Sequence, residues 1–278
     1  MTFNLKKYKQ ELSVLVSNNA VSENHQGLSR NFDYIRNRLK QAQFEIQIIS
    51  PNSSAPIIYA IKGNPESSKK VGLYSHYDVE LTNEEKWTHN ATKLHVIEDR
   101  LYGRGVADNL GILLLRMMAI ENLPDAEIPE IHWIFQGEEE IGAPLAHEEF
   151  PKMNIPKMNV WFEETGYYDL GRYRQRYLTL NEDPDLTNVL EIATDLLNDL
   201  QFSAYTENRI LTKFDECPFI KHILLDQPYL AIGPNDEYSR IHEPNESLSI
   251  PLIQKSFEQF SAVLKHYSKF KIQEDLLK

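Results

Sequence analysis

The feature that most constrains the fold is an alternation of short apolar runs with helix-forming segments, in which most apolar runs stop at a polar cluster. The expected buried strands are 70–75, 131–135, 159–162 and 230–232, with an additional strand pair at 44–49 and 57–61. The expected helices are 5–16, 28–42, 110–120, 185–200 and 248–267. This alternation predicts an α/β fold, a three-layer αβα sandwich with a mixed central sheet. Sites in such sheets gather beyond the carboxyl ends of the strands.

Length and charge limit the class of protein. The chain has 278 residues, and we expect one catalytic domain over 1–278. The net charge of −12 would repel a phosphate backbone, so we expect no nucleic-acid partner. Cys217 is the only cysteine, which excludes an intrachain disulfide and fits a reducing compartment. We see no signal peptide and no apolar run of membrane-spanning length, so we expect a cytoplasmic protein without membrane contact.

Two polar clusters in the first half of the chain contain possible metal ligands. His76 is two residues from Asp78 at a strand end, where the carboxylate can orient the imidazole toward a metal. An ordinary loop pair is the alternative for these two residues. Asp108 follows two glycines and directly precedes an apolar helix. A helix cap is the alternative for Asp108.

Three further clusters follow later apolar runs. The string GEEEIG at 137–142 places three adjacent glutamates after a strand, which is costly without a cation unless the charges point apart in a solvated turn. Glu163 ends another strand, and His242 lies in a turn-rich loop, where a lone histidine is usually a surface residue. Histidine and carboxylate ligands without cysteine suit a catalytic zinc pair, with manganese or cobalt as alternatives. An aspartate can bridge two such ions with one oxygen on each.

The order of these motifs resembles the metallopeptidase family of the aminoacylases, carboxypeptidase G, peptidase T and succinyl-diaminopimelate desuccinylase. The resemblance covers roughly 70–246 and is carried by LYGRGVADNLG at 101–111, GEEEIG at 137–142, and GP at 233–234 followed by IHEPNE at 241–246. It implies a dinuclear metal-dependent hydrolase of an amide bond.

The resemblance also implies roles for single residues. Glu139 becomes the general base and Asp78 the residue that orients a ligand, although the triple glutamate leaves the register open by one residue toward Glu138. Asp215 matches weakly a family segment near the substrate. The implied metal ligands, for two divalent ions, are His76, Asp108 as the bridge, Glu140, Glu163 and His242.

One departure from the family concerns its inserted lid and dimerisation domain, which has about a hundred residues. Here only a short remnant at 167–183 occupies that place, so we expect no dimer formed through a lid. The family's lid supplies an oxyanion donor and groups for the substrate carboxylate. The candidates to replace these groups are arginines, although the arginine-rich string at 172–177 reads equally as a solvated edge strand. They are Arg172, Arg174, Arg176 and Arg240.

The expected substrate is a small N-acyl amino acid or short peptide, cut by a deacylase or carboxypeptidase. An aminopeptidase with an open site is the alternative, because a carboxylate that holds a free amine is as available as a cation that holds a carboxylate. A binding protein that keeps a metal site without catalysis is the alternative of another class.

Overall fold

The computed structural model describes residues 2–63, 69–163, 166–181, 184–208 and 217–269, and Asp215 lies outside these ranges. The helices are α1 (Leu5–Ser17), α2 (His25–Gln41), α3 (Leu110–Glu121), α4 (Pro144–Glu149), α5 (Pro184–Asp195) and α6 (Ile250–Lys269). The strands are β1 (Glu45–Ile49), β2 (Ile57–Lys62), β3 (Lys70–His76), β4 (His95–Ile97), β5 (Arg100–Tyr102), β6 (Glu130–Gln136), β7 (Val160–Glu163), β8 (Tyr167–Asp169), β9 (Arg174–Leu180), β10 (Ser203–Asn208), β11 (Tyr229–Ala231), β12 (Asn235–Asp236) and β13 (Ser247–Ser249).

The main sheet is mixed, as the alternating pattern predicts. Its strand order is β1-β2-β6-β3-β7-β11-β9-β8-β12, and β10 pairs with β9. The four neighbours β6, β3, β7 and β11 are parallel, whereas β1, β2 and β9 run antiparallel to their partners in that order. The carboxyl ends of the four parallel strands therefore meet at one edge of the sheet, where polar residues follow them in sequence.

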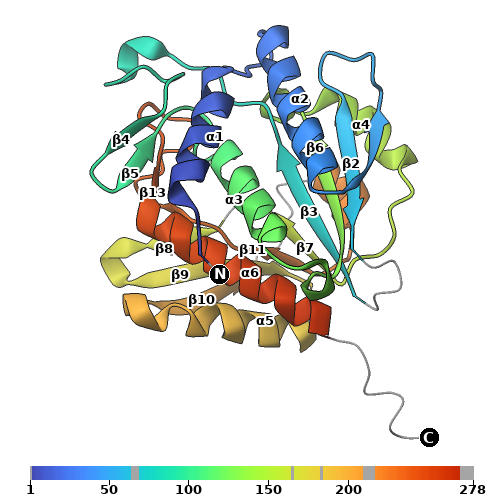
Figure 1. Cartoon of the computed structure of the whole chain (residues 1–278), viewed down its shortest axis with the longest axis vertical. Coiled ribbons are helices and arrows are strands. Elements are labelled where there is room, and N and C mark those ends of the chain that lie inside the picture. The colour runs from blue at the N-terminus through green and yellow to red at the C-terminus, as the bar shows by residue number, and fades with distance from the viewer. Residues whose placement is uncertain (1, 64–68, 164–165, 182–183, 209–216, 270–278) are drawn as a thin grey trace, which may run out of the picture.

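Alternating side chains along the central strands divide the core into two layers. In β6, Trp133 and Phe135 belong to the larger core, whereas Ile134 belongs to the smaller one. Helices α1, α2, α3, α5 and α6 contribute to the larger core and lie together on one side of the sheet (Figure 1). The short α4 and a π-helical turn at Phe219–Leu224 cover the other side. The expected α/β sandwich is confirmed, with unequal helical layers.

Helix α3 is the element that the apolar pattern describes best. Every residue from Leu110 to Ile120 is buried, which agrees with a helix that is apolar on nearly all its faces. Its N-cap position is taken by Asn109, not by Asp108, and no side chain caps it. The cap that was the alternative for Asp108 is therefore not formed. Within the described ranges, no helix combines the length and apolarity needed to cross a membrane.

The interpretation of 172–177 as a solvated edge strand is wrong. Strand β9 has β10 on one side and β11 and β8 on the other, and the side chains of Gln175 and Tyr177 are buried. The sequence does not show that β9 is an interior strand, because its neighbour β10 has the sequence SAYTEN, which contains few apolar residues. A small sheet of β13, β5 and β4 was also not expected, and it takes up 247–249 ahead of α6.

Candidate metal centre

Four side chains that are far apart in the sequence meet beyond the carboxyl ends of the parallel strands. His76 is the last residue of β3, Asp108 directly precedes Asn109 and α3, and Glu140 lies in the 3₁₀ turn after β6. Ligand atoms of these three residues lie within 4.8 Å of one another. His242 reaches the same cluster from the loop between β12 and β13, with its Nε2 atom 2.9 Å from Glu140 Oε2.

Asp108 lies between the two imidazoles. Its Oδ1 atom is 3.0 Å from His76 Nε2, and its Oδ2 atom is 3.1 Å from His242 Nε2. Each carboxylate oxygen is thus directed at a different histidine. A carboxylate whose two oxygens face different imidazoles can bridge two cations.

Asp78 supports two members of the cluster from behind. The Nδ1 atom of His76 lies 3.3 Å from Asp78 Oδ1 and 3.1 Å from the Asp78 carbonyl oxygen. The backbone amide of Glu140 donates to Asp78 Oδ2 at 3.1 Å. His76 and Asp78 are both buried, so the contact between His76 Nδ1 and Asp78 fixes the orientation of the His76 ring. Carboxylates orient metal-binding histidines in this way.

The carboxylates and histidines of the cluster shift one another's pKa values in the direction that favours positive charge on the histidines. Burial opposes ionisation of Asp108, but hydrogen bonds from His242 and His76 outweigh it and lower the pKa of this carboxyl. Hydrogen bonds to Asp108 and Glu140 raise the pKa of His242 to about 10. Burial alone would lower the pKa of His76, but Asp108 and Asp78 raise it well above its usual value. The carboxylates thus favour the protonated form of both histidines, and a divalent ion can take the place of such protons.

The donor set fits a pair of divalent metal ions. The Glu140 side chain is 5% exposed, yet its Oε1 atom has no hydrogen-bond partner among the residues that the structure describes. A buried carboxylate oxygen without a partner is costly, and a metal ion satisfies it. Two imidazoles and several carboxylates, with no thiolate, are ligands that zinc accepts at catalytic sites.

Glu163, the fifth predicted ligand, lies at the end of the strand next to β3. It ends β7, next to β3, and its Oε2 atom accepts a hydrogen bond from the Tyr229 hydroxyl at 2.6 Å. Arg116 donates to its carbonyl oxygen. Among the described residues, the groups of ligand atoms within 4.8 Å do not include Glu163. The structure thus brings four of the five predicted ligands together and places the fifth at the neighbouring strand end.

The adjacent glutamates Glu138 and Glu139 have different surroundings. Burial raises the pKa of the Glu139 carboxyl; the charge of His76 opposes this rise, and Glu140 and Asp108 add to it. Glu139 is therefore within electrostatic reach of the cluster. Glu138 has a left-handed backbone with φ of 60°, and its Oε1 atom accepts a hydrogen bond from the Ser54 hydroxyl at 2.8 Å.

Comparison with known proteins gives the family. The model of Peptidase family M20/M25/M40 matches residues 72–266, well over half of the chain. The chain belongs to Peptidase family M20/M25/M40. The resemblance predicted from the motifs is confirmed, and the match covers all the residues of the cluster.

Curated relatives of this M20/M25/M40 chain include two dipeptidases. It is 34% identical over 101 residues to a Beta-Ala-His dipeptidase of Rattus norvegicus, a match of 35% of this chain and 20% of that protein. It is 25% identical over 148 residues to a Cysteinylglycine-S-conjugate dipeptidase of Corynebacterium striatum, a match of 51% of this chain and 32% of that protein. The matched segments thus span between a fifth and a third of these relatives.

Solved structures share the M20/M25/M40 fold at low identity. An M20 family metallo-carboxypeptidase, Sso-CP2 of Sulfolobus solfataricus, superposes with a TM-score of 0.75 at 14% identity, covering 96% of this chain and 100% of that one. The di-peptidase Dug1p of Saccharomyces cerevisiae superposes with a TM-score of 0.71 at 14% identity, covering 96% and 97%. These likenesses agree with the catalytic-domain fold predicted from the alternating pattern.

Two acidic residues at or next to the cluster have no role in the prediction from sequence. Glu80 has a carboxylate oxygen within 4.8 Å of ligand atoms of Glu140 and His242. Its position four residues after His76, in the loop that follows β3, was the available signal. Glu246 is fully buried and contacts the segment that ends at Asp108. It was visible only as the last letter of IHEPNE.

The arginines that were candidates for the substrate have protein partners. Arg172 and Arg174 lie 3.6 and 3.7 Å from Asp169, and Arg176 lies 3.4 Å from Glu207. Arg240 donates to the Pro244 carbonyl oxygen at 3.4 Å. Among the residues with described positions, no lysine or arginine forms an ion pair with Glu80, Glu139 or Glu140.

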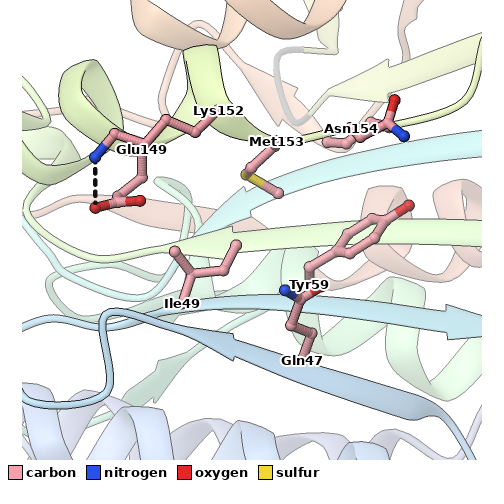
Figure 2. A pocket seen from close by; sticks show the side chains of 8 residues that line it. Gln47, Ile49, Tyr59, Glu149, Lys152, Met153 and Asn154 are labelled. Carbon is pink, nitrogen blue, oxygen red and sulfur yellow. Dashed lines mark hydrogen bonds and ion pairs between the residues drawn. The ribbon is translucent and has the colours of Figure 1, made fainter.

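A separate hollow of about 340 Å³ lies between β1, β2 and the 3₁₀ turn at Phe150–Lys152 (Figure 2). It shares no lining residue with the cluster. The Tyr59 hydroxyl is 2.5 Å from His132 Nδ1, and Lys152 is paired with Glu149 at 3.2 Å. Tyr59, Glu149 and Lys152 in the lining of this hollow therefore already have partners among the described residues.

Proposed function

We propose that this chain is a dinuclear metal-dependent hydrolase that cleaves the amide bond of a dipeptide or similarly small peptide. The observation that carries the proposal is the position of Asp108, with one oxygen at each of two histidines and with Glu139 and Glu140 beside it. Membership of Peptidase family M20/M25/M40 and the dipeptidase names of the relatives support it.

The cluster divides into two ligand sets that share Asp108. His76 and Asp108 Oδ1 would hold one ion, with Glu163 as the third ligand at the end of β7. His242, Glu140 and Asp108 Oδ2 would hold the other. When bound, two zinc ions supply Lewis-acid polarisation of the amide carbonyl and acidify the attacking water.

Glu139 is the proposed general base. Its raised pKa brings the carboxyl closer to the working range of proton transfer, and it would pass the water's proton to the leaving amine. Asp78 would hold the His76 ring in place and, through the Glu140 amide, the second ligand set. Retention of this base and of the cluster speaks against a binding protein without catalysis.

The charge around the cluster favours substrates with a free amine. The Glu80 carboxylate adjoins Glu140 and His242, and it accepts a hydrogen bond only from the Leu81 backbone among the hydrogen bonds formed by described residues. A substrate ammonium group would pair with it. This favours a dipeptidase of aminopeptidase type over an N-acyl amino acid deacylase.

A deacylase or carboxypeptidase is the second candidate, and Arg240 favours it. This arginine is exposed and lies two residues before His242, so its guanidinium is the nearest cation in sequence to a predicted ligand. Such a cation would pair with a substrate carboxylate.

The single-domain organisation is part of the proposal. The segment at 167–181 contains β8 and β9 of the main sheet, so this part of the proposed lid remnant contributes to the proposed catalytic domain. The His242 side chain is 51% exposed, which supports a site that is open on this side.

Hydrolysis assays with purified protein test the function. Metal-free and zinc-loaded protein would be given dipeptides, N-terminally acetylated dipeptides and N-acetyl amino acids. We expect zinc-dependent cleavage of free dipeptides and at least a tenfold loss on acetylation. Cleavage confined to N-acyl amino acids would select the second candidate, and no zinc-dependent cleavage of any substrate would refute the hydrolase.

A further inference from the structure

Glu246 is a buried carboxylate that the proposed chemistry does not use. Its side chain is 0% exposed, and it accepts four hydrogen bonds from a single segment of the chain. Oε2 accepts from Arg104 Nη1 at 2.8 Å and from the Gly105 amide at 3.0 Å. Oε1 accepts from the amides of Ala107 and Asp108 at 2.7 and 3.0 Å.

The recipient segment is shaped to meet this carboxylate. Gly105 has φ of +83°, and a side chain at that position would meet Val79 at 2.4 Å. The left-handed backbone at Gly105 lets its own amide and those of Ala107 and Asp108 turn toward one carboxylate. The Arg104 guanidinium balances the buried charge and also lies over the Trp87 ring at 5.3 Å.

The same contacts join the two loops that carry Asp108 and His242. Glu246 is four residues after His242, and its carbonyl oxygen accepts from the Gly103 amide at 3.2 Å. Its neighbour Asn245 accepts from the Thr88 amide at 2.8 Å. Since the two loops are otherwise separate in sequence, Glu246 connects one predicted ligand of the cluster to the predicted bridge.

We propose that Glu246 is a positioning residue for the metal pair, which sets the distance between the Asp108 carboxylate and the His242 ring. The inference rests on the proposed function, because it takes Asp108 and His242 as ligands. Glu246 acts through the Asp108 backbone and has no contact with the substrate.

The physical reason lies in the direction of its hydrogen bonds. A glutamine at this position keeps the shape, but its NH₂ group must face either Arg104 and Gly105 or Ala107 and Asp108, all of which are donors. One pair of donors then loses its acceptor and the segment shifts. Groups that orient metal ligands in this way change metal affinity by about 10–100-fold when they are replaced.

Glu246→Gln therefore serves as the test variant, and Asp236→Asn is its matched control. Asp236 is an equally buried carboxylate in the same region, and it accepts from Arg100 at 2.8 and 3.0 Å. None of the hydrogen bonds of its carboxylate to described residues, which come from Arg100 and the Tyr238 amide, involves the Gly105–Asp108 segment. Both substitutions remove a buried carboxylate paired with arginine, but only Glu246→Gln disturbs the acceptors of the segment that ends at Asp108.

The readout is zinc affinity of the metal-free proteins, measured by competition with a chromophoric chelator, together with thermal unfolding. We expect wild type to bind two zinc ions, Glu246→Gln to bind them about 10–100-fold more weakly, and Asp236→Asn to match wild type. Wild-type affinity in Glu246→Gln would overturn the inference, as would an equal loss in Asp236→Asn. A wild-type protein that binds no zinc would instead refute the proposed function itself.

Glu246→Asp keeps the test open where the glutamine variant does not fold. It retains the charge for Arg104 but is one methylene shorter, so it cannot reach both pairs of donors. We expect a folded protein with reduced zinc affinity. Full affinity in this variant would also overturn the inference.

Discussion

Glu139 and Glu138 are adjacent in the chain and both are half-buried, yet only Glu139 has a pKa that is raised by burial and influenced by the charges of His76, Glu140 and Asp108. We predict that Glu139→Gln keeps zinc but lowers kcat by about 10²–10⁴-fold, because an amide cannot take the water's proton. Glu138→Gln is the control, because the Glu138 carboxylate accepts a hydrogen bond from Ser54. This variant should retain most activity. The reverse result in steady-state assays would place the base one residue earlier.

Cys217 gives a second prediction at the residue scale. Burial raises the pKa of this thiol to about 11. Since the thiolate is the nucleophile, the population that reacts at pH 8 should be smaller than that of a free thiol by on the order of 10²-fold. Alkylation by iodoacetamide, followed by mass spectrometry, should be slow at pH 8 and accelerate up to about pH 11. A rate that levels off near pH 8.5 would show an ordinary thiol.

At the scale of elements, β11 supports the end of β7. The Tyr229 hydroxyl donates to Glu163 Oε2 at 2.6 Å, so it orients this proposed ligand. We predict that Tyr229→Phe weakens one of the two zinc sites by about tenfold and leaves the fold intact. Tyr168→Phe is the control, because the Tyr168 hydroxyl is also buried but donates a hydrogen bond to Gln259. Equal zinc titrations for both variants would remove Tyr229 from the site.

The elements that hold the site are also those that the sequence predicts well. Strands β3, β6, β7 and β11 are short apolar runs, because burial on both faces leaves no place for polar residues. Strand β10 and the small sheet of β4, β5 and β13 were missed, because partly exposed strands carry mixed sequences. Their pairing depends on distant segments that no local pattern contains.

The site itself was predictable in part. Ligand types and their order were visible, and so was their placement after strands. The roles of Glu80 and Glu246 were not, because both depend on loops that approach each other only in the folded chain. The sequence also leaves open which of the adjacent glutamates is the general base. Glu138 accepts a hydrogen bond from Ser54, whereas Glu139 is influenced by the charges of the cluster, which favours Glu139 as the base.

At the scale of the whole molecule, the segment at 167–181 contributes strands to the main sheet. We predict that the protein does not dimerise through a lid and that its specific activity is constant across a dilution series of a confirmed monomer. Analytical ultracentrifugation alongside activity measures both quantities. Activity that falls on dilution, together with dissociation, would show that a second copy completes the site. Cytoplasmic location and the lack of a nucleic-acid partner stay predictions from composition.

The central claim is that Asp108 bridges two metal ions, and anomalous scattering from zinc-loaded crystals tests it most directly. We predict two peaks at the zinc edge, one between His76 and Asp108 Oδ1 and the other among His242, Glu140 and Asp108 Oδ2. A single peak, or peaks away from Asp108, would contradict it.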